Sequence, residues 1–182
     1  MYRYSEQNLI EEPTKQLFVE LGYEVMDCRD EVVGENATLG RETNRDVVLI
    51  PRLRKAIERL NPSLPIESID TAVRELTKDR SALHPTLANK EVYALLKDGV
   101  ATSIRASDGS IRGQTVKVID WDTASNNDFF LASQFWVAGD LGRKRPDLIG
   151  FINGLPLVFV ELKALHVSAK DAYEKNLSDY KV

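Results

Sequence analysis

The feature that most constrains this chain is a pair of apolar runs joined by a turn signal, in RPDLIGFINGLPLVFVELKA at residues 145–164. Asn153-Gly154 is a strong signal for a two-residue hairpin turn, because the favoured turn needs positive φ at both positions. The runs 148–152 and 157–162 are rich in the branched and aromatic residues that favour strands. The sequence therefore predicts an antiparallel hairpin here.

Charged residues stand at the open end of this hairpin. Asp147 precedes the first run, and Glu161 and Lys163 end the second. Side chains alternate along a strand, so Glu161 and Lys163 share one face while Leu162 points away. The hairpin would bring Asp147 back toward Glu161. Two acids beside a lysine could hold a divalent cation such as Mg²⁺, which prefers carboxylate oxygens and retains several waters.

A simpler interpretation treats Glu161 and Lys163 as a surface ion pair on a half-exposed sheet. Against it, the apolar residues around them indicate burial on both faces, and buried charges are costly unless they are paired or bound to metal. On the residues alone, both interpretations stay open.

Two groups of cations have a similar ambiguity. Arg143, Lys144 and Arg145 fall in the expected loop 139–145, directly before Asp147, where they are either ordinary exposed charges or a means of steering a phosphodiester. Four more lie on an expected helix and are favoured as a solvated face over phosphate contacts: Arg52, Arg54, Lys55 and Arg59.

Composition narrows the class of protein. With 182 residues and 43% hydrophobic content, the chain can bury one full core. A net charge of −4 neither confirms nor excludes DNA binding, because a magnesium site is itself acidic. Cys28, the single cysteine, excludes an internal disulfide and, with two histidines, leaves no familiar zinc spacing. These features, with no signal-peptide core and no apolar run of membrane-spanning length, predict a cytoplasmic protein.

Periodicity predicts both helices and strands, and hence an α/β fold with a mixed central sheet flanked by helices. The expected helices are 5–22, 52–60, 66–76, 89–97 and 168–180. The expected strands are 23–28, 101–105, 115–121, 129–137 and the two runs of the hairpin. No phosphate-binding loop is present, since GDLGRKR at 139–145 lacks the required spacing, and no serine or cysteine nucleophile signature appears.

Residues 146–147 and 161–163 resemble a known sequence motif. Pro146-Asp147 followed by Glu161-Leu162-Lys163 has the form of the PD-(D/E)xK nuclease motif. The wider stretch NNDFFLASQFWVAGDLGRKRPDLIGFINGLPLVFVELKA resembles the nuclease region of type I restriction enzyme R subunits, as do LIPRLRKAIERLNP at 49–62 and GYEV at 22–25. The resemblance runs over nearly the whole chain and implies a single endonuclease domain over 1–182 with a restriction-endonuclease-like core and a helical insertion at about 50–100.

The resemblance also implies roles for the residues of the motif. Asp147, Glu161 and the backbone carbonyl of Leu162 would ligate Mg²⁺, and Lys163 would orient or help deprotonate the attacking water and stabilise charge at phosphorus. Glu11 on the first helix is the best match to a further metal-site glutamate.

Two further positions belong to a supporting helix motif of such nucleases. Tyr180 matches the tyrosine of its QxxxY element, and Asn176 stands where glutamine is expected. The shorter amide of Asn176 changes the reach of that side chain.

The implied function is the nuclease module of a type I restriction-modification complex, acting on double-stranded DNA with methyltransferase and specificity subunits and no membrane. The chain is then the N-terminal fragment of a longer subunit whose ATP-dependent motor, absent here, binds the ATP. Two alternatives are a free-standing nuclease of the same fold, complete at this length, and a non-catalytic docking module that kept the fold. Intact Asp147, Glu161 and Lys163 disfavour the docking module.

Overall fold

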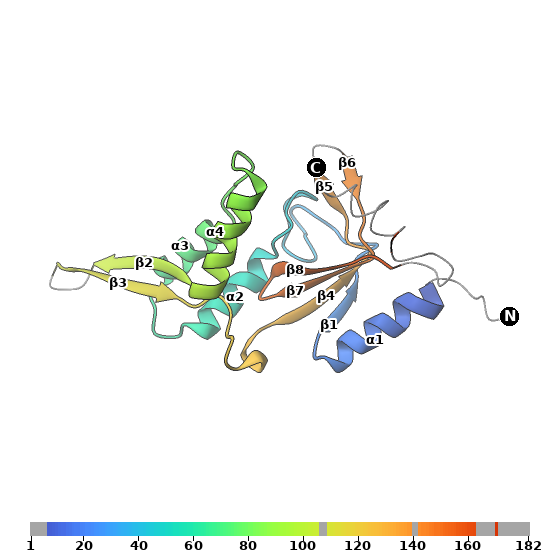
Figure 1. Ribbon diagram of the computed structural model, residues 1–182, viewed down its shortest axis with the longest axis horizontal. Coiled ribbons are helices and arrows are strands. Elements are labelled where there is room, and N and C mark those ends of the chain that lie inside the picture. Colours follow the sequence, from blue (N-terminus) through green and yellow to red (C-terminus); the bar gives the residue numbers. More distant parts are fainter. Residues whose placement is uncertain (1–6, 106–108, 140–141, 163–169, 171–182) are drawn as a thin grey trace.

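The computed structural model describes residues 7–105, 109–139, 142–162 and 170. Its centre is a four-stranded sheet in the order β1-β4-β7-β8 (Figure 1). The strands are β1 (Glu24–Asp27), β4 (Phe129–Ser133), β7 (Leu148–Ile152) and β8 (Leu155–Val160). β1 is parallel to β4, and the other neighbours are antiparallel. The expected architecture, a mixed sheet flanked by helices, is confirmed.

The expected hairpin forms at β7 and β8. Asn153 and Gly154 have φ of 52° and 77°, the left-handed pair that the turn requires. A Cβ on Gly154 would lie 2.6 Å from both the carbonyl oxygen of Leu49 and the amide nitrogen of Leu53. Only glycine therefore lets the turn dock against the start of α2 (Ile50–Leu60).

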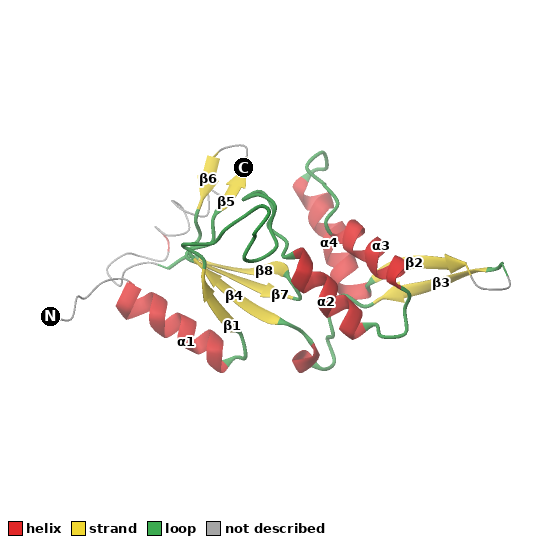
Figure 2. Ribbon diagram, turned by 180° about the vertical axis from the view of Figure 1, so that it is seen from behind, coloured by secondary structure: helices red, strands yellow, loops and turns green. Residues whose placement is uncertain are grey.

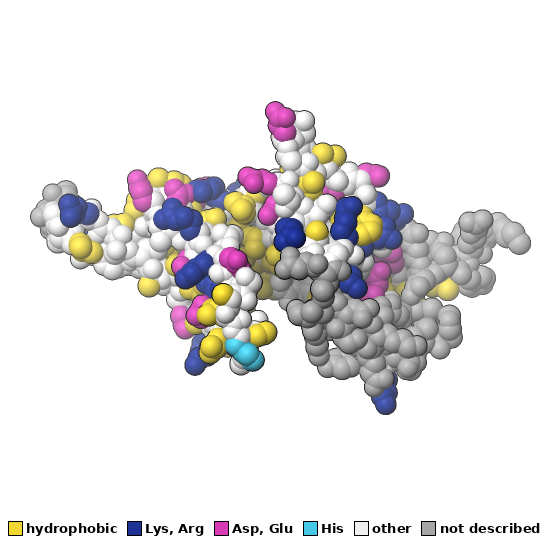
Figure 3. Space-filling view, turned by 90° about the horizontal axis from the view of Figure 1, so that it is seen from above, with side chains coloured by type: hydrophobic (Ala, Val, Ile, Leu, Met, Phe, Trp, Pro, Cys, Tyr) yellow, Lys and Arg dark blue, Asp and Glu magenta, His cyan; other side chains and the backbone are white. Residues whose placement is uncertain are grey.

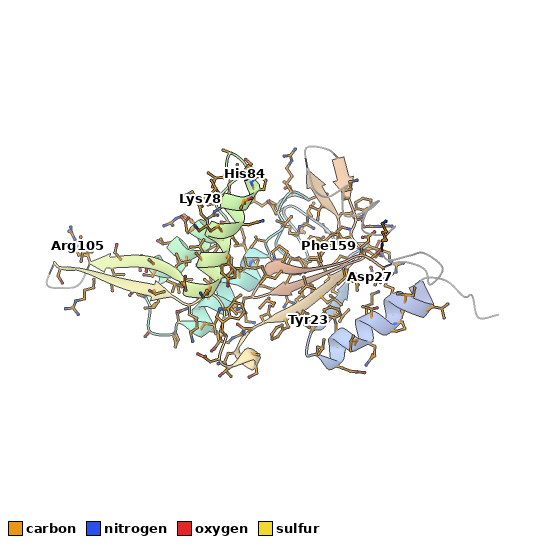
Figure 4. All side chains as sticks on the ribbon, in the orientation of Figure 1. Tyr23, Asp27, Lys78, His84, Arg105 and Phe159 are labelled. Atoms are coloured by element: carbon orange, nitrogen blue, oxygen red, sulfur yellow. The ribbon has the colours of Figure 1, made fainter. Side chains whose placement is uncertain are left out.

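Different elements cover the two faces of the sheet. On one face, α1 (Glu12–Glu20) approaches through an aromatic row in which Tyr23 lies 4.9 Å from Phe18 and 5.1 Å from Phe129, between ring centroids. Tyr23 is the middle ring of this row and is labelled in Figure 4, between the sheet and α1. The other face carries an apolar cluster from the sheet and the segment before α2: Cys28, Leu49, Phe130, Ala132, Phe135, Ile149 and Phe151.

A second cluster holds together the part of the molecule beyond the hairpin turn. This part consists of α2, α3 (Ile66–Leu76), α4 (Pro85–Asp98) and a hairpin of β2 (Val100–Arg105) and β3 (Ile111–Val116). The β2–β3 hairpin projects away from the sheet (Figure 2). The buried residues of the second cluster include Leu53, Ile57, Ile69, Ala72, Val73, Val100, Val116 and Val118. Over the described residues, no helix is both long and apolar enough to cross a membrane.

Several expected element bounds are wrong. α4 begins at Pro85 instead of Asn89, with His84 as its N-cap, because a proline is tolerated in the first turn of a helix. β3 ends at Val116 instead of Trp121. The apolar run 129–137 is broken at Gln134, and the expected loop 139–145 contains β6 (Gly142–Lys144), which pairs with β5 (Val137–Gly139). A short 3-10 turn, Ala124–Asn126, precedes β4. The helix expected at 168–180 lies outside the described residues except for position 170.

Candidate active site at the strand ends

The register of the β7–β8 hairpin decides which residue faces Asp147. Ile152 pairs with Leu155 and Phe151 with Pro156, and continuing that count would set Val160 opposite Asp147. A β-bulge intervenes, since Gly150 pairs with Val158 and leaves Leu157 as the extra residue. Leu148 consequently pairs with Val160, so the next position places Glu161 opposite Asp147. The bulge brings the two acids to one end of the sheet.

A hydrogen bond joins the two strands beyond the last ladder pair. The backbone N–H of Leu162 donates to Oδ2 of Asp147 at 2.8 Å. Asp147 and Glu161 are both partly buried, and the Oε2 oxygen of Glu161 is shielded from solvent. Buried Pro146 and Leu148 flank Asp147, so its carboxylate stands where the apolar interior meets the surface.

Glu11 reaches the same end of the sheet from the first helix. Residues Gln7–Glu11 form a single π-helical turn, a feature that often marks functional sites, and α1 follows with Pro13 in its first turn. Glu11 is buried, with 7% of its surface exposed. Its Oε1 lies 2.7 Å from Nζ of Lys15, and its Oε2 accepts a long hydrogen bond of 3.4 Å from Nε2 of Gln134.

Lys15 is itself buried, with 9% of its surface exposed. Burial alone would lower the pKa of Lys15, but hydrogen bonds to Glu11 and Glu12 and the charges of both acids outweigh it, so the pKa lies above its ordinary value. Lys15 therefore stays protonated and keeps a positive charge against Glu11.

Gln134 connects this helix to Asp147. Its backbone N–H donates to the carbonyl oxygen of Asp147 at 3.0 Å, which extends the β4–β7 ladder by one pair. Gln134, Asp147 and Glu161 thus follow one another across three neighbouring strand ends. Asp27 ends β1 nearby, paired with Ser133 in register, and forms an ion pair of 3.0 Å with Arg29. Asp27 and Phe159, labelled in Figure 4, show this end of the sheet.

The donor set suits a hard cation. The carboxylates of Asp147 and Glu161 and the backbone carbonyl of Leu162 supply oxygen atoms, the type of ligand that Mg²⁺ prefers. In the described part of the chain, no group of three or more histidine, cysteine, aspartate or glutamate side chains is gathered for a metal.

Cations and an aromatic ring lie next to this site in sequence. Arg143 and Arg145 approach the ring of Trp136, with guanidinium carbons 4.9 and 5.1 Å from its centroid. β6 carries Arg143 and Lys144, and both arginines are exposed. Viewed from above in Figure 3, dark blue side chains gather beside an apolar patch in this region. Stacking on an aromatic face limits the conformations of a guanidinium group.

The cations of α2 are mostly engaged within the protein. Arg52 bridges Glu24 at 2.6 Å and Asp128 at 3.0 Å, and Arg54 pairs with Asp70 at 2.6 Å. Arg59 donates to the carbonyl oxygen of Asn126 at 2.8 Å, while Lys55 is exposed. With Glu24 and Asp128, Arg52, Lys55 and Arg59 line a pocket of about 340 Å³. The helix lies at the opposite end of β7–β8 from Asp147, beside the hairpin turn.

Some predicted residues fall outside the described part of the chain, namely Lys163, Asn176 and Tyr180. The structure in turn shows residues that the sequence did not single out. Lys15 lies four positions after Glu11, a spacing that could have revealed their pairing on a helix. Gln134 and Trp136 gave no such signal, because their contacts depend on the break in the apolar run 129–137.

Comparison with known proteins gives concordant matches. The model of the family described as type I restriction enzyme R protein N terminus matches residues 3–182. The type I restriction enzyme HindI endonuclease subunit of Haemophilus influenzae is 37% identical over 159 residues, which cover 86% of this chain and 15% of that protein. A putative type I restriction enzyme MjaIXP endonuclease subunit of Methanocaldococcus jannaschii is 33% identical over 146 residues, covering 78% of this chain and 14% of that protein. The chain thus spans a small part of the length of these relatives.

Proposed function

Because the chain belongs to the family of type I restriction enzyme R proteins, as their N-terminal part, we propose that it is the magnesium-dependent endonuclease module of a type I restriction-modification complex. The reaction is hydrolysis of DNA phosphodiester bonds. We place the active site at the strand ends around Asp147, Glu161 and Lys163, the PD-(D/E)xK residues.

The observation that supports this most is the bulged register of β7 and β8. It sets two acidic residues, 14 positions apart in sequence, opposite each other at one end of the sheet, and the Leu162 N–H holds the carboxylate of Asp147. A surface ion pair would need none of this arrangement. Two partly buried acidic residues at neighbouring strand ends favour the binding of a cation, because like charges close together repel.

In this proposal Asp147, Glu161 and the carbonyl of Leu162 hold Mg²⁺. When bound, the cation acts as a Lewis acid that polarises the phosphodiester and favours deprotonation of water. The Leu162 N–H fixes the rotamer of Asp147, so the carboxylate is ordered before any ligand arrives. The ammonium of Lys163 would orient the attacking water and stabilise negative charge that develops on the phosphate oxygens.

Neighbouring cations would bring the substrate to this site. Arg143, Lys144 and Arg145 stand immediately before Asp147, and stacking on Trp136 holds the two arginines in place for backbone phosphates. The cations of α2 are assigned no such role, since Arg52 and Arg54 neutralise Glu24, Asp70 and Asp128 and the helix lies at the opposite end of the hairpin. Asn176 and Tyr180 would support the site from the following segment.

The remaining parts of the proposal concern the longer protein. The matched relatives are about seven times the length that the chain covers, which supports an ATP-dependent motor elsewhere in the subunit. The chain would form one endonuclease domain in which α2, α3 and α4 make up the helical insertion. Methyltransferase and specificity subunits would direct it to double-stranded DNA in the cytoplasm.

The test is Asp147→Asn in the full-length subunit, assembled with its partner subunits. Double-strand cleavage in Mg²⁺ should fall below detection while ATP hydrolysis and translocation continue, since Asn lacks the charge that holds the cation. Asp98→Asn, an exposed change at the end of α4, is the matched control and should cut as the unaltered enzyme does. Cleavage by Asp147→Asn at the unaltered rate would refute the proposed site.

A further inference from the structure

The backbone of Gln134 is unusual for its residue type. Among the described residues, only Gln134 and Asn153 are non-glycine positions with positive φ, at 56° and 52°. Asn153 is accounted for by the hairpin turn, which requires that conformation. Glutamine has no comparable local reason, and a left-handed conformation in such a residue is a reservoir of strain that clusters at functional sites.

The conformation lets one residue make two contacts in different directions. The backbone N–H of Gln134 donates to the carbonyl oxygen of Asp147 at 3.0 Å. The side-chain amide donates to Oε2 of Glu11 at 3.4 Å. Without the left-handed turn, the chain would continue as β4 and its side chains would keep the regular alternation. Gln134 therefore lies between the first helix and the strand that carries the proposed metal-binding aspartate.

Glu11 is well fixed on its own side of this contact. It is buried on a π-helical turn and held by Lys15 at 2.7 Å. A buried ion pair of this kind is costly to build, which gives it weak value for stability alone. It is better explained as an anchor whose position relative to the strand ends matters.

We propose that Gln134 is a positioning residue of the active site, which fixes Asp147 relative to Glu11 on the first helix and thereby sets the affinity of the strand ends for a divalent cation. This inference rests on the proposed function. Glu11 then influences the cation affinity through its hydrogen bond from Gln134. Outer residues that orient metal ligands typically change metal affinity by about 10- to 100-fold when they are removed.

The experiment measures cation binding apart from catalysis. Manganese(II) is titrated calorimetrically into the full-length subunit without nucleotide, and the same titration of Asp147→Asn is subtracted to isolate the strand-end site. Gln134→Gly removes the amide and relieves the left-handed backbone. Gln134→Asn keeps an amide and a residue that tolerates the left-handed region, but is one methylene shorter. Gln16→Ala, an exposed glutamine of α1, is the control.

Both Gln134 variants should bind manganese at least about tenfold more weakly, whereas Gln16→Ala should match the unaltered protein. The midpoint temperature of thermal unfolding without metal should not be lower in Gln134→Gly, because glycine removes the backbone strain. This measurement distinguishes a loss of positioning from a loss of the fold. In a Glu11→Ala background, Gln134→Gly should add no further loss of affinity.

Two results would overturn the inference while leaving the proposed function intact: unaltered manganese affinity in both Gln134 variants, or losses that simply add in the Glu11→Ala background. If the unaltered protein and Asp147→Asn bind manganese equally, the proposed metal site itself is wrong. The titrations therefore distinguish the failure of one idea from the failure of the other.

Discussion

The backbone N–H of Leu162 donates a hydrogen bond of 2.8 Å to Oδ2 of Asp147. In sequence, Leu162 stands between Glu161 and Lys163, so this bond ties the aspartate of the motif to the segment that carries its other two members. The carboxylate is held by a main-chain N–H, which only a proline at position 162 would remove. Substitutions of Glu161 or Lys163 keep both partners of this bond and should therefore alter metal binding or chemistry without separating the strands.

Lys163→Ala tests the chemical role of the lysine. We expect folding and divalent-cation affinity to stay nearly unchanged, because an ammonium group is no metal ligand. The cleavage rate should fall by about two orders of magnitude or more, roughly 3 kcal/mol of transition-state stabilisation. Single-turnover cleavage with a parallel metal titration makes the comparison. A variant that loses metal affinity together with activity would contradict the assigned role.

The next prediction concerns the cations of the β5–β6 hairpin and the residue after it. They are neutralised by replacing Arg143, Lys144 and Arg145 with glutamine. DNA affinity should fall. The slope of log affinity against log salt should become less negative by up to about 3, since each lost phosphate contact reduces its magnitude by about 0.9. The control carries the same charge change at Lys78, Lys90 and Lys97, exposed residues of the helical part. Equal slopes for the two triple variants would mean that the hairpin charges make no special contact with DNA.

Cys28 should make stability depend on alkaline pH. Burial, with the nearby charges of Glu31 and Asp27, raises the pKa of its thiol from 9.0 to about 12. Below pH 9 both the folded and unfolded forms hold the proton, so the full contribution to stability is present. As pH rises from 9 toward 12 only the unfolded form loses the proton, and stability falls by up to about 1.4 kcal/mol per pH unit.

The measurement is urea unfolding between pH 8 and 11 for the unaltered protein and for Cys28→Ala, which lacks this group. The difference between the two free energies of unfolding should shrink steadily above pH 9. A constant difference would show that the thiol titrates alike in both states.

Arg41→Met should be the most destabilising of these changes. Arg41 is fully buried, pairs with Glu31 at 2.6 Å, and donates to three carbonyl oxygens, those of Asn44, Asp46 and Trp136. Removing the guanidinium leaves a buried carboxylate and three acceptors without their donor, which costs about 3–5 kcal/mol. Chemical denaturation gives the value. Glu31→Gln, which keeps an acceptor for Arg41, should cost clearly less, and the reverse order would contradict this account.

Local patterns in the sequence predicted much of the fold. The helix over 66–76 matches α3 in both bounds, because its apolar period and the preceding proline act locally. Asn153-Gly154 predicted the hairpin, since the turn is a property of two residues. Asp147 and Glu161 were assigned to one site for the same reason.

What the sequence could not predict depends on contacts between distant segments. A regular hairpin would have set Val160 opposite Asp147, and no local sequence signal marks the bulge at Leu157 that corrects the register on this edge strand. Likewise, Glu31 reads as part of a polar loop until Arg41 is placed against it in the interior. The left-handed Gln134 is a third case, visible only after β4 and β7 are paired.

The bulge at Leu157 also bears on how the hairpin can change length during evolution. Leu157 has no partner in the β7–β8 register, so deleting it would leave Asp147 opposite Glu161 in an unbroken ladder. Loss of any paired residue would instead exchange the faces of the side chains on one side of the gap. Homologous chains can therefore differ by one residue between the aspartate and the glutamate and still share the same strand-end geometry. A search pattern with fixed spacing would miss them.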